Sequence, residues 1–277
     1  MLYGAKEKKL QLSFGEIDYI TFGRGKKPLV MIQGLNTRGI HGMALPLAYM
    51  YRIFAKAYTV YIFDRRPNVF EGITVKTLAE DTAAAMDALG LQNAAVIGVS
   101  QGGMIAQYLA IDRPDLVEKL VLAVTLSRNN DTVKSVIAHW ISLTEQNQMK
   151  ELIRDMAEKM YSPAYIRKYK AFLPLLTVVQ KPKDKERFIH LAKACLTCDT
   201  YDALAQIQCP TLVLGGGMDK IVGIEASREI AQKLGCAVHI YSDLGHAAYE
   251  EATDFNQRMF DFLKGSSANG KDLDRNV

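Results

Sequence analysis

The sequence predicts an α/β protein with a doubly wound, mostly parallel sheet and an inserted helical segment. Short apolar runs bounded by Gly, Pro or polar residues recur along the chain, at 28–33, 58–63, 94–99, 119–126, 210–215 and 237–241. Most of these runs lack polar alternation, so both faces of each strand must be covered, as in a parallel sheet. Amphipathic helical patterns separate the runs, and this alternation predicts right-handed crossovers.

Other segments refine this outline. Residues 10–23 (LQLSFGEIDYITFG) predict an antiparallel hairpin that leads into the sheet. Gly90 is expected to end one helix, and Pro114 to end the helix that follows residue 100.

A change of pattern divides the chain into two parts. From about residue 128 to 206 the strand-like runs stop and amphipathic helical segments follow one another, which predicts a cap inserted between two strands of one sheet. We therefore expect a core made of residues 1–127 and 207–264 and a helical cap at 128–206. The polar residues 265–277 are expected to form a disordered tail.

Composition excludes several classes of protein. Hydrophobic residues make up 49% and charged residues 23% of the 277 residues, as in an ordinary globular protein. The basic residues are scattered and the net charge is only +4, which argues against nucleic acid as a partner. The apolar runs are all too short to cross a bilayer, and the N-terminal lysines precede no apolar stretch, so a cytoplasmic protein without membrane or signal segments is expected.

The four cysteines are expected to be reduced thiols. Cys195 and Cys198 form a C-x-x-C, but no second cluster follows at zinc-ligand spacing, and the preceding LAKA predicts the interior of a helix. We therefore expect neither a metal nor a cofactor.

A nucleophile motif lies between a predicted strand and a predicted helix. Gly98-Val99-Ser100-Gln101-Gly102 fits G-x-S-x-G, between the run AAVIGV and the segment QGGMIAQYLA. A serine on so sharp a turn needs small neighbours two residues away on either side. It also lies at a helix N-terminus, where the backbone amides favour developing negative charge. Ser100 is therefore the predicted nucleophile.

The base and the acid are predicted from their places after later strands. Asp219 follows the strand that resumes after the cap, where three glycines would let the chain turn, and His246 follows the last strand. This is the Ser, acid, His order of the motif, and the three side chains should meet at the carboxyl edge of the sheet. Asp243 is the rival acid. The other histidines, at positions 41, 139, 190 and 239, are expected to be structural or exposed.

With these motifs the chain resembles the cap-bearing α/β-hydrolase superfamily, in its serine esterase and enol-lactonase-like branch, from PLVMIQG to the final helix. The resemblance implies an α/β-hydrolase fold with an oxyanion hole made by the backbone amides of Leu35 and Gln101. Gln33 stands where the family usually has histidine, a change that backbone donors tolerate. The segment 64–72 (DRRPNVFEG) departs from the usual Arg-Gly-x-Gly-x-Ser pattern, and its role stays open.

A serine nucleophile argues against haloalkane dehalogenase and epoxide hydrolase activity, which need a carboxylate. The expected function is acyl-enzyme hydrolysis of small carboxylic esters, with lactones or carbon-carbon bonds as alternative substrates. Arg38, Trp140 and Phe172 are candidate substrate contacts, although each could equally be exposed or packed in the cap. A receptor with slow hydrolysis is the alternative from another class, and a hydroxynitrile lyase is a third. The expected partner is a small ester or lactone, and the oligomeric state is left open.

Overall fold

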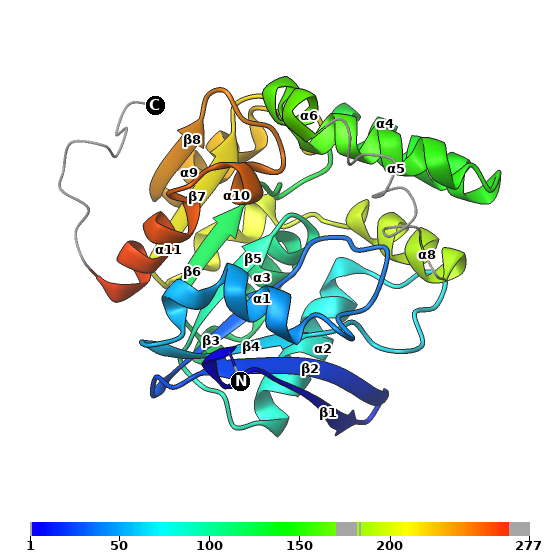
Figure 1. The fold of residues 1–277 in the computed structure, drawn as a ribbon. Coiled ribbons are helices and arrows are strands. Elements are labelled where there is room, and N and C mark those ends of the chain that lie inside the picture. Colours follow the sequence, from blue (N-terminus) through cyan, green and yellow to red (C-terminus); the bar gives the residue numbers. More distant parts are fainter. Residues whose placement is uncertain (1, 170–181, 183, 266–277) are drawn as a thin grey trace.

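A central sheet of eight strands organises the molecule (Figure 1). The computed structural model describes residues 2–169, 182 and 184–265. The strands lie in the order β1-β2-β4-β3-β5-β6-β7-β8. Their bounds are β1 Lys6–Leu12, β2 Gly15–Gly23, β3 Lys27–Ile32, β4 Tyr58–Phe63, β5 Ala94–Val99, β6 Val117–Ala123, β7 Thr211–Gly216 and β8 Ala237–Tyr241. The β1–β2 and β2–β4 pairs are antiparallel and the others are parallel. The predicted doubly wound, mostly parallel sheet is confirmed.

Each predicted apolar run forms a strand, and the predicted hairpin is β1–β2. The prediction for 119–126 is wrong at its end, because β6 stops at Ala123. Val124 has a φ of 44°, and its amide still donates to Leu214 O at 2.8 Å. The chain therefore leaves the sheet at Val124, although an apolar residue follows at 126.

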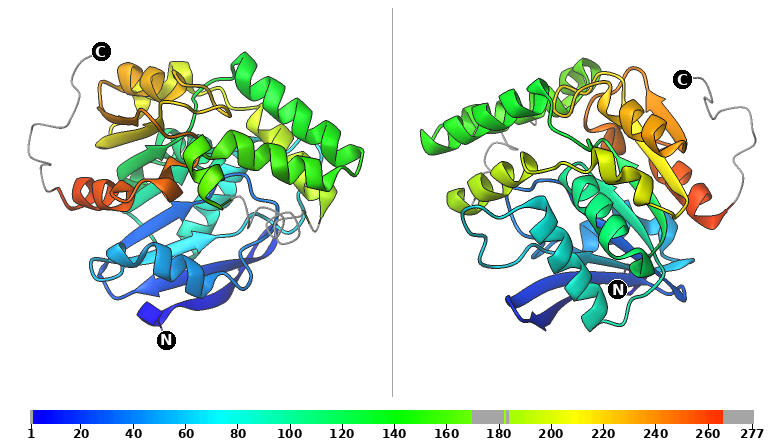
Figure 2. Two further views of the ribbon diagram at one scale, coloured as in Figure 1. Left: turned by 45° about the horizontal axis from the view of Figure 1, so that its top comes forward. Right: turned by 180° about the vertical axis from the view of Figure 1, so that it is seen from behind.

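Helices cover both faces of the sheet. On one face lie α1 (Ala44–Met50) and α11 (Phe255–Lys264), which pack on buried strand residues such as Met31 and Ile97. On the other lie α2 (Val75–Ala88), α3 (Gln101–Asp112) and α9 (Ala226–Leu234), in front of the sheet when it is seen from behind (Figure 2, right). The short α10 (Ala248–Glu251) precedes α11, and 3-10 turns span Leu2–Gly4, Arg52–Phe54, Pro114–Leu116 and Tyr201–Gln206.

The predicted helix ends agree with the structure. The left-handed Gly90, with a φ of 65°, follows α2, and Pro114 begins a 3-10 turn just after α3. The described helices are all too short or too polar to cross a bilayer.

A group of helices follows β6 and precedes β7 (Figure 1). We call α4 (Asp131–Glu145), α5 (Met149–Met160), α6 (Pro163–Tyr169) and α8 (Lys185–Cys195) the cap helices. The chain returns to the point where it left the sheet: Arg128 and Asp199 form an isolated β-bridge, and Thr200 N donates to Ser127 O at 2.7 Å. The division into core and cap stays a prediction, and residues 266–277 of the expected tail lie outside the described residues.

The two cysteines of the C-x-x-C do not both lie within a helix. Cys195 is the last residue of α8, and Cys198 lies beyond its end, so the prediction of a helix interior is wrong for Cys198. The chain turns after Cys195 because Leu196 caps the helix, and this turn points the Cys198 thiol at Leu126 O, 3.6 Å away. Burial raises the pKa of Cys195 to about 11 and that of Cys198 to about 12. Both groups are therefore poor nucleophiles near neutral pH.

Candidate active site

Ser100 lies on a sharp turn between β5 and α3. Its φ and ψ are 54° and −121°, a combination that few non-glycine residues adopt. Two contacts from the β6 end hold the turn. Ser100 N donates to Ala123 O at 2.9 Å, and Thr125 Oγ1 donates to Ser100 O at 2.8 Å. The early exit of the chain from β6 thus fixes the strained backbone of the turn.

Glycines flank this turn because the backbone segments are too close for a side chain. A Cβ on Gly98 would lie 2.4 Å from Gly102 O, and a Cβ on Gly102 would lie 2.0 Å from Ile32 O. Both distances are shorter than any real carbon-oxygen contact. The G-x-S-x-G spacing is therefore a packing requirement of the strand–turn–helix unit.

Three polar side chains form a continuous chain of hydrogen bonds at this turn. Ser100 Oγ lies 2.9 Å from His246 Nε2, and His246 Nδ1 lies 2.8 Å from Asp219 Oδ2. Asp219 and His246 are each 3% exposed, and Ser100 is half-buried. The second carboxylate oxygen of Asp219 accepts from the amides of Ile221 at 2.8 Å and Val222 at 3.0 Å. Asp219 is thus held in one orientation, with Oδ2 facing the imidazole.

The loops that carry the acid and the histidine pack directly on each other. A Cβ on Gly216 would lie 2.2 Å from Gly245 O, and one on Gly217 would lie 2.8 Å from Ser242 O. Met218 N donates to Leu244 O at 2.9 Å across the same contact. The three glycines were expected to allow a turn, but none of them has a positive φ. That reason was wrong: Gly216 and Gly217 are needed because the two loops approach so closely, and Gly215 because a Cβ there would lie 2.6 Å from Ser227 Oγ of α9.

The predicted oxyanion loop passes against the serine. A Cβ on Gly34 would lie 3.2 Å from Ser100 Cβ and 3.7 Å from its Oγ, so a side chain here would crowd the serine. Leu35 is the next residue. Gln101 is the first residue of α3, where backbone amides have no acceptor within their own helix. Gln101 follows Ser100 in the chain, and Leu35 follows Gly34, the residue that lies against Ser100. The role of the Leu35 and Gln101 amides as oxyanion donors stays a prediction.

The segment 64–72, whose role the sequence left open, begins with a half-buried residue that connects three elements. Asp64 Oδ2 accepts from Ile40 N at 3.0 Å, beyond the oxyanion loop. Its Oδ1 accepts from Arg65 N at 2.7 Å and from Arg187 Nη2 of α8 at 3.1 Å. One carboxylate therefore joins the β4 end, the loop after β3 and a cap helix.

Two further polar side chains near the site were not predicted from the sequence. The Gln101 side chain is fully buried, and its Nε2 donates to Leu191 O of α8 at 2.7 Å and contacts Cys195 Sγ at 3.2 Å. The Arg65 guanidinium donates to Gln33 O at 2.6 Å, and burial lowers the pKa of Arg65 to about 10. These hydrogen bonds connect the start of α3 to α8 and the segment after β4 to the segment after β3.

Of the remaining candidate residues, Trp140 and Arg38 are not part of the Ser100–His246–Asp219 hydrogen-bonded chain. Trp140 is buried in α4 and donates its indole N–H to Asp155 Oδ2 of α5 at 2.7 Å. Arg38 is exposed, and Phe172 lies outside the described residues. Substrate contacts by these three residues stay predictions.

The competing acid and bases are also away from the triad. Asp243 is exposed beside Ser242. His41 is exposed 3.4 Å from Glu7, and His139 lies 3.8 Å from Asp155 in the cap helices. Within the described residues, no three His, Cys, Asp or Glu side chains are grouped to hold a metal ion.

Comparisons with known proteins agree on one family. A sequence model of the alpha/beta hydrolase fold family matches residues 27–253. A 2-hydroxy-6-oxononadienedioate/2-hydroxy-6-oxononatrienedioate hydrolase of a Pseudomonas species is 26% identical over 262 residues, 90% of this chain and 92% of that protein. A putative carbamate hydrolase of Caulobacter is 27% identical over 83% of this chain and 90% of that protein.

Solved structures agree on the fold. The enol-lactonase from Burkholderia xenovorans LB400 aligns over 93% of this chain and all of its own, with a TM-score of 0.81 and 23% identity. The match to the family extends over most of the chain, and the fold and the G-x-S-x-G turn agree with it. The chain therefore belongs to the alpha/beta hydrolase fold family, as its sequence motifs predict.

Proposed function

We propose that this protein is a serine hydrolase that cleaves small carboxylic esters through an acyl-enzyme. The observation that carries the proposal is the unbroken chain of hydrogen bonds from Ser100 Oγ through His246 to Asp219, at a strained turn. A serine hydroxyl is a weak nucleophile at neutral pH and needs an adjacent base. The imidazole at 2.9 Å is such a base.

The proposed first half-reaction forms the acyl-enzyme. His246 Nε2 takes the proton of Ser100 Oγ as that oxygen attacks the ester carbonyl carbon. The oxyanion that forms accepts hydrogen bonds from the Leu35 and Gln101 amides. His246 then gives the proton to the leaving alcohol oxygen, and the carbon–oxygen bond of the ester breaks.

The second half-reaction hydrolyses the acyl-enzyme. His246 takes a proton from water, the hydroxide attacks the acyl carbon, and Ser100 Oγ leaves with the proton that His246 returns. Throughout, Asp219 keeps the proton on Nδ1 and stabilises the imidazolium. Asp219 is suited to this role because its other oxygen is already held by two backbone amides.

A second candidate function is hydrolysis of a carbon-carbon bond or an enol-lactone. It is favoured by the similarity, over 90% of this chain, to the Pseudomonas dienedioate hydrolase, and by 3-oxoadipate enol-lactonases of Acinetobacter that are 21% and 24% identical. The same serine, base and oxyanion donors serve such substrates, because each reaction passes through an attacked carbonyl.

The test begins with a fluorophosphonate probe and mass spectrometry of the intact protein and its peptides. We expect one adduct on Ser100, and hydrolysis of p-nitrophenyl esters that Ser100→Ala lowers by at least a thousandfold with unchanged folding. Ser127→Ala, a change in a buried serine after β6, is the matched control and should keep the adduct. A labelled Ser100 with turnover of dienedioates or enol-lactones but not esters would favour the second candidate. Ester turnover that survives in Ser100→Ala would contradict the mechanism.

A further inference from the structure

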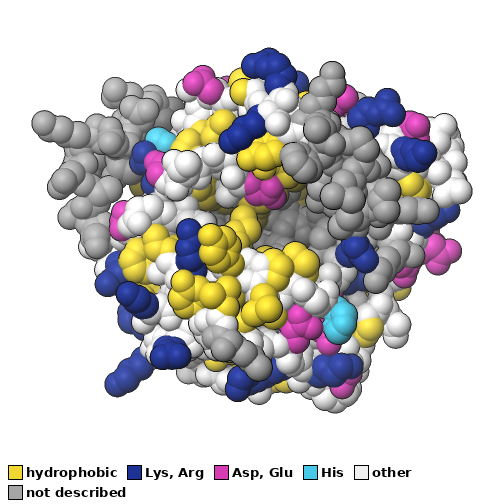
Figure 3. All heavy atoms as spheres, in the orientation of Figure 1, with side chains coloured by type: hydrophobic (Ala, Val, Ile, Leu, Met, Phe, Trp, Pro, Cys, Tyr) yellow, Lys and Arg dark blue, Asp and Glu magenta, His cyan; other side chains and the backbone are white. Residues whose placement is uncertain are grey.

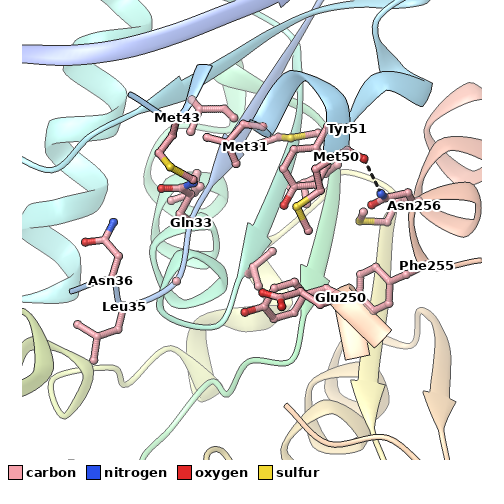
Figure 4. Close-up of a pocket in the computed structure, with 18 residues that line it drawn as sticks. Met31, Gln33, Leu35, Asn36, Met43, Met50, Tyr51, Glu250, Phe255 and Asn256 are labelled. Carbon is pink, nitrogen blue, oxygen red and sulfur yellow. Dashed lines mark hydrogen bonds between the residues drawn. The ribbon is translucent and has the colours of Figure 1, made fainter. Parts of the chain in front are cut away.

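A cavity of about 280 Å³ lies between α1, α11 and the sheet, beside the catalytic turn (Figure 4). Its wall is mostly apolar and contains four methionines, Met31 from β3, Met43 and Met50 at the two ends of α1, and Met259 from α11. Methionine side chains are flexible and polarisable, so such a wall adapts to a flexible apolar guest. The volume is near the lower end of the range for small-molecule sites.

The cavity shares a wall with the catalytic group. Val99, which precedes Ser100, lines it, and so does Tyr249, three residues after His246. Gly34 also lines it and touches Ser100, since a Cβ there would lie 3.2 Å from Ser100 Cβ. An acyl group bonded to Ser100 Oγ would therefore meet Gly34, whose missing side chain leaves room toward the cavity.

The polar side chains on the wall are amides, tyrosine hydroxyls and one carboxylate: Gln33, Asn36, Tyr51, Tyr249, Glu250 and Asn256. Asn36 Oδ1 and Asn256 Oδ1 are buried without a partner among the described residues, and Glu250 adds a carboxylate. Asn256 donates instead through Nδ2, to Met50 O at 3.0 Å (Figure 4). Among the described residues that line the cavity, none is lysine or arginine. A carboxylate placed here would be desolvated without a cation, which is unfavourable.

An apolar surface adjoins the cavity at Met43. Hydrophobic side chains gather over α1 in the space-filling view (Figure 3), where Met43, Leu45 and Tyr49 are 41%, 56% and 59% exposed. Met43 belongs both to this face and to the cavity wall. A hydrocarbon chain can thus enter along an apolar route.

We propose that this cavity receives the acyl chain of the substrate, and that the chain is an uncharged, flexible hydrocarbon. The inference rests on the proposed acyl-enzyme chemistry at Ser100 and names its substrate class: esters of neutral, medium-length carboxylic acids. Each methylene that enters the cavity should raise kcat/KM about fourfold, until the chain fills the cavity.

The experiment uses two series of probes on the full chain. The first is p-nitrophenyl acetate, butyrate, hexanoate and octanoate, and the second is p-nitrophenyl alkylphosphonates of the same lengths, which report binding and attack without turnover. A third comparison sets p-nitrophenyl hexanoate against the mono-p-nitrophenyl ester of adipate, in which a carboxylate replaces the terminal methyl group at the same chain length. We expect kcat/KM for the esters and the labelling rate for the phosphonates to rise with chain length. We also expect kcat/KM for the neutral hexanoate to be at least tenfold higher than for the adipate ester.

Two variants fill the cavity and one serves as a control. Leu47→Phe adds volume inside, because Leu47 of α1 is 7% exposed and lines the cavity. Met43→Trp narrows the mouth at an exposed position that tolerates bulk. Leu45→Phe changes the same helix on its solvent side. The ratio of octanoate to acetate should fall at least tenfold in the first two variants and stay within twofold in the control, with similar thermal unfolding midpoints.

The outcomes separate the two proposals. If Ser100 is labelled by the methylphosphonate and esters turn over, but the rate is flat with chain length or unchanged by Leu47→Phe and Met43→Trp, the acyl cavity is overturned and the serine hydrolase stands. A preference for the adipate ester would also overturn it. If neither series reacts at Ser100, both proposals fail.

Discussion

Replacing Asp219 by asparagine tests whether this carboxylate sets the protonation of His246. The change keeps the size of the side chain but replaces one acceptor oxygen by a donor. In the protein, Oδ1 accepts from the Ile221 and Val222 amides and Oδ2 faces His246 Nδ1 at 2.8 Å. An asparagine that keeps the two backbone bonds must point its NH₂ group at the imidazole. Nδ1 then has to accept, so the ring proton moves to Nε2 and Ser100 loses its base.

The expected loss of kcat follows from the free-energy cost of turning the asparagine side chain into the other orientation. An asparagine turned to offer its oxygen to His246 would direct its NH₂ group at the two backbone amides, leaving both buried without an acceptor. Each such amide costs about 1 to 3 kcal/mol, so the useful orientation is disfavoured by about 2 to 6 kcal/mol. We therefore expect kcat to fall between about thirtyfold and about 10⁴-fold, the upper end matching the loss known for this substitution in serine protease triads.

The assay measures kcat and KM for p-nitrophenyl butyrate, together with the rate of fluorophosphonate labelling. Both rates should fall while the thermal midpoint changes little, because the two backbone hydrogen bonds survive. Asp243→Asn is the control, since Asp243 is exposed and lies outside the hydrogen-bonded chain. A loss below tenfold in Asp219→Asn, or a larger loss in Asp243→Asn, would refute the assignment of the acid.

Two further predictions concern stability and thiol chemistry. Asp64→Ala removes the carboxylate that accepts from Ile40 N and Arg187 Nη2, and it leaves the half-buried arginine without this partner. The free energy of unfolding, measured by urea titration, should therefore fall by about 3 kcal/mol. A change below about 0.5 kcal/mol would contradict the role of Asp64. Cys195 and Cys198 should react at least a hundredfold more slowly with a thiol reagent at pH 8 in the native protein than in urea, because burial raises the pKa of both. Peptide mapping that finds either cysteine modified as fast in the native protein as in urea would count against this prediction.

The catalytic candidates could be predicted because their signals are local. Ser100 lies in a five-residue motif whose glycines are required by contacts within one strand–turn–helix unit. Asp219 and His246 each follow an apolar strand, and parallel strands place their carboxyl ends at one edge of the sheet. Knowledge of strand order alone therefore brings the three residues together.

The links between the core and the cap helices could not be predicted, because they join distant segments. Asp64 is 123 positions from Arg187, and Gln101 is 90 positions from Leu191. Nothing in the pattern around Asp64 indicates which helix will pack on it. The end of β6 was missed for a similar reason: Leu126 continues an apolar run, but contacts with Ser100 turn the chain away earlier.

The cavity beside α1 also could not be predicted from the sequence. Its methionines come from β3, from both ends of α1 and from α11, and each one alone fits a core position. A cavity arises only from what the packed helices leave empty, and hydrophobic periodicity does not record this space. Two of the three predicted substrate contacts, Trp140 and Phe172, belong to the expected cap, and Trp140 donates its indole N–H to Asp155 on the neighbouring helix.

Hydrogen bonds connect α8 to both sides of the predicted oxyanion hole. Leu35 follows Gln33, whose carbonyl is bound by Arg65, and Arg65 follows Asp64, which pairs with Arg187 of α8. Gln101, at the other side of the predicted oxyanion hole, is bonded by its side chain to Leu191 of the same helix. Gln101 is therefore attached to α8 by its own side chain, and Leu35 is linked to α8 indirectly, through Gln33, Arg65 and Asp64. A displacement of α8 would strain both at once, so loss of Asp64 should lower ester turnover as well as stability, although Asp64 has no contact with the triad.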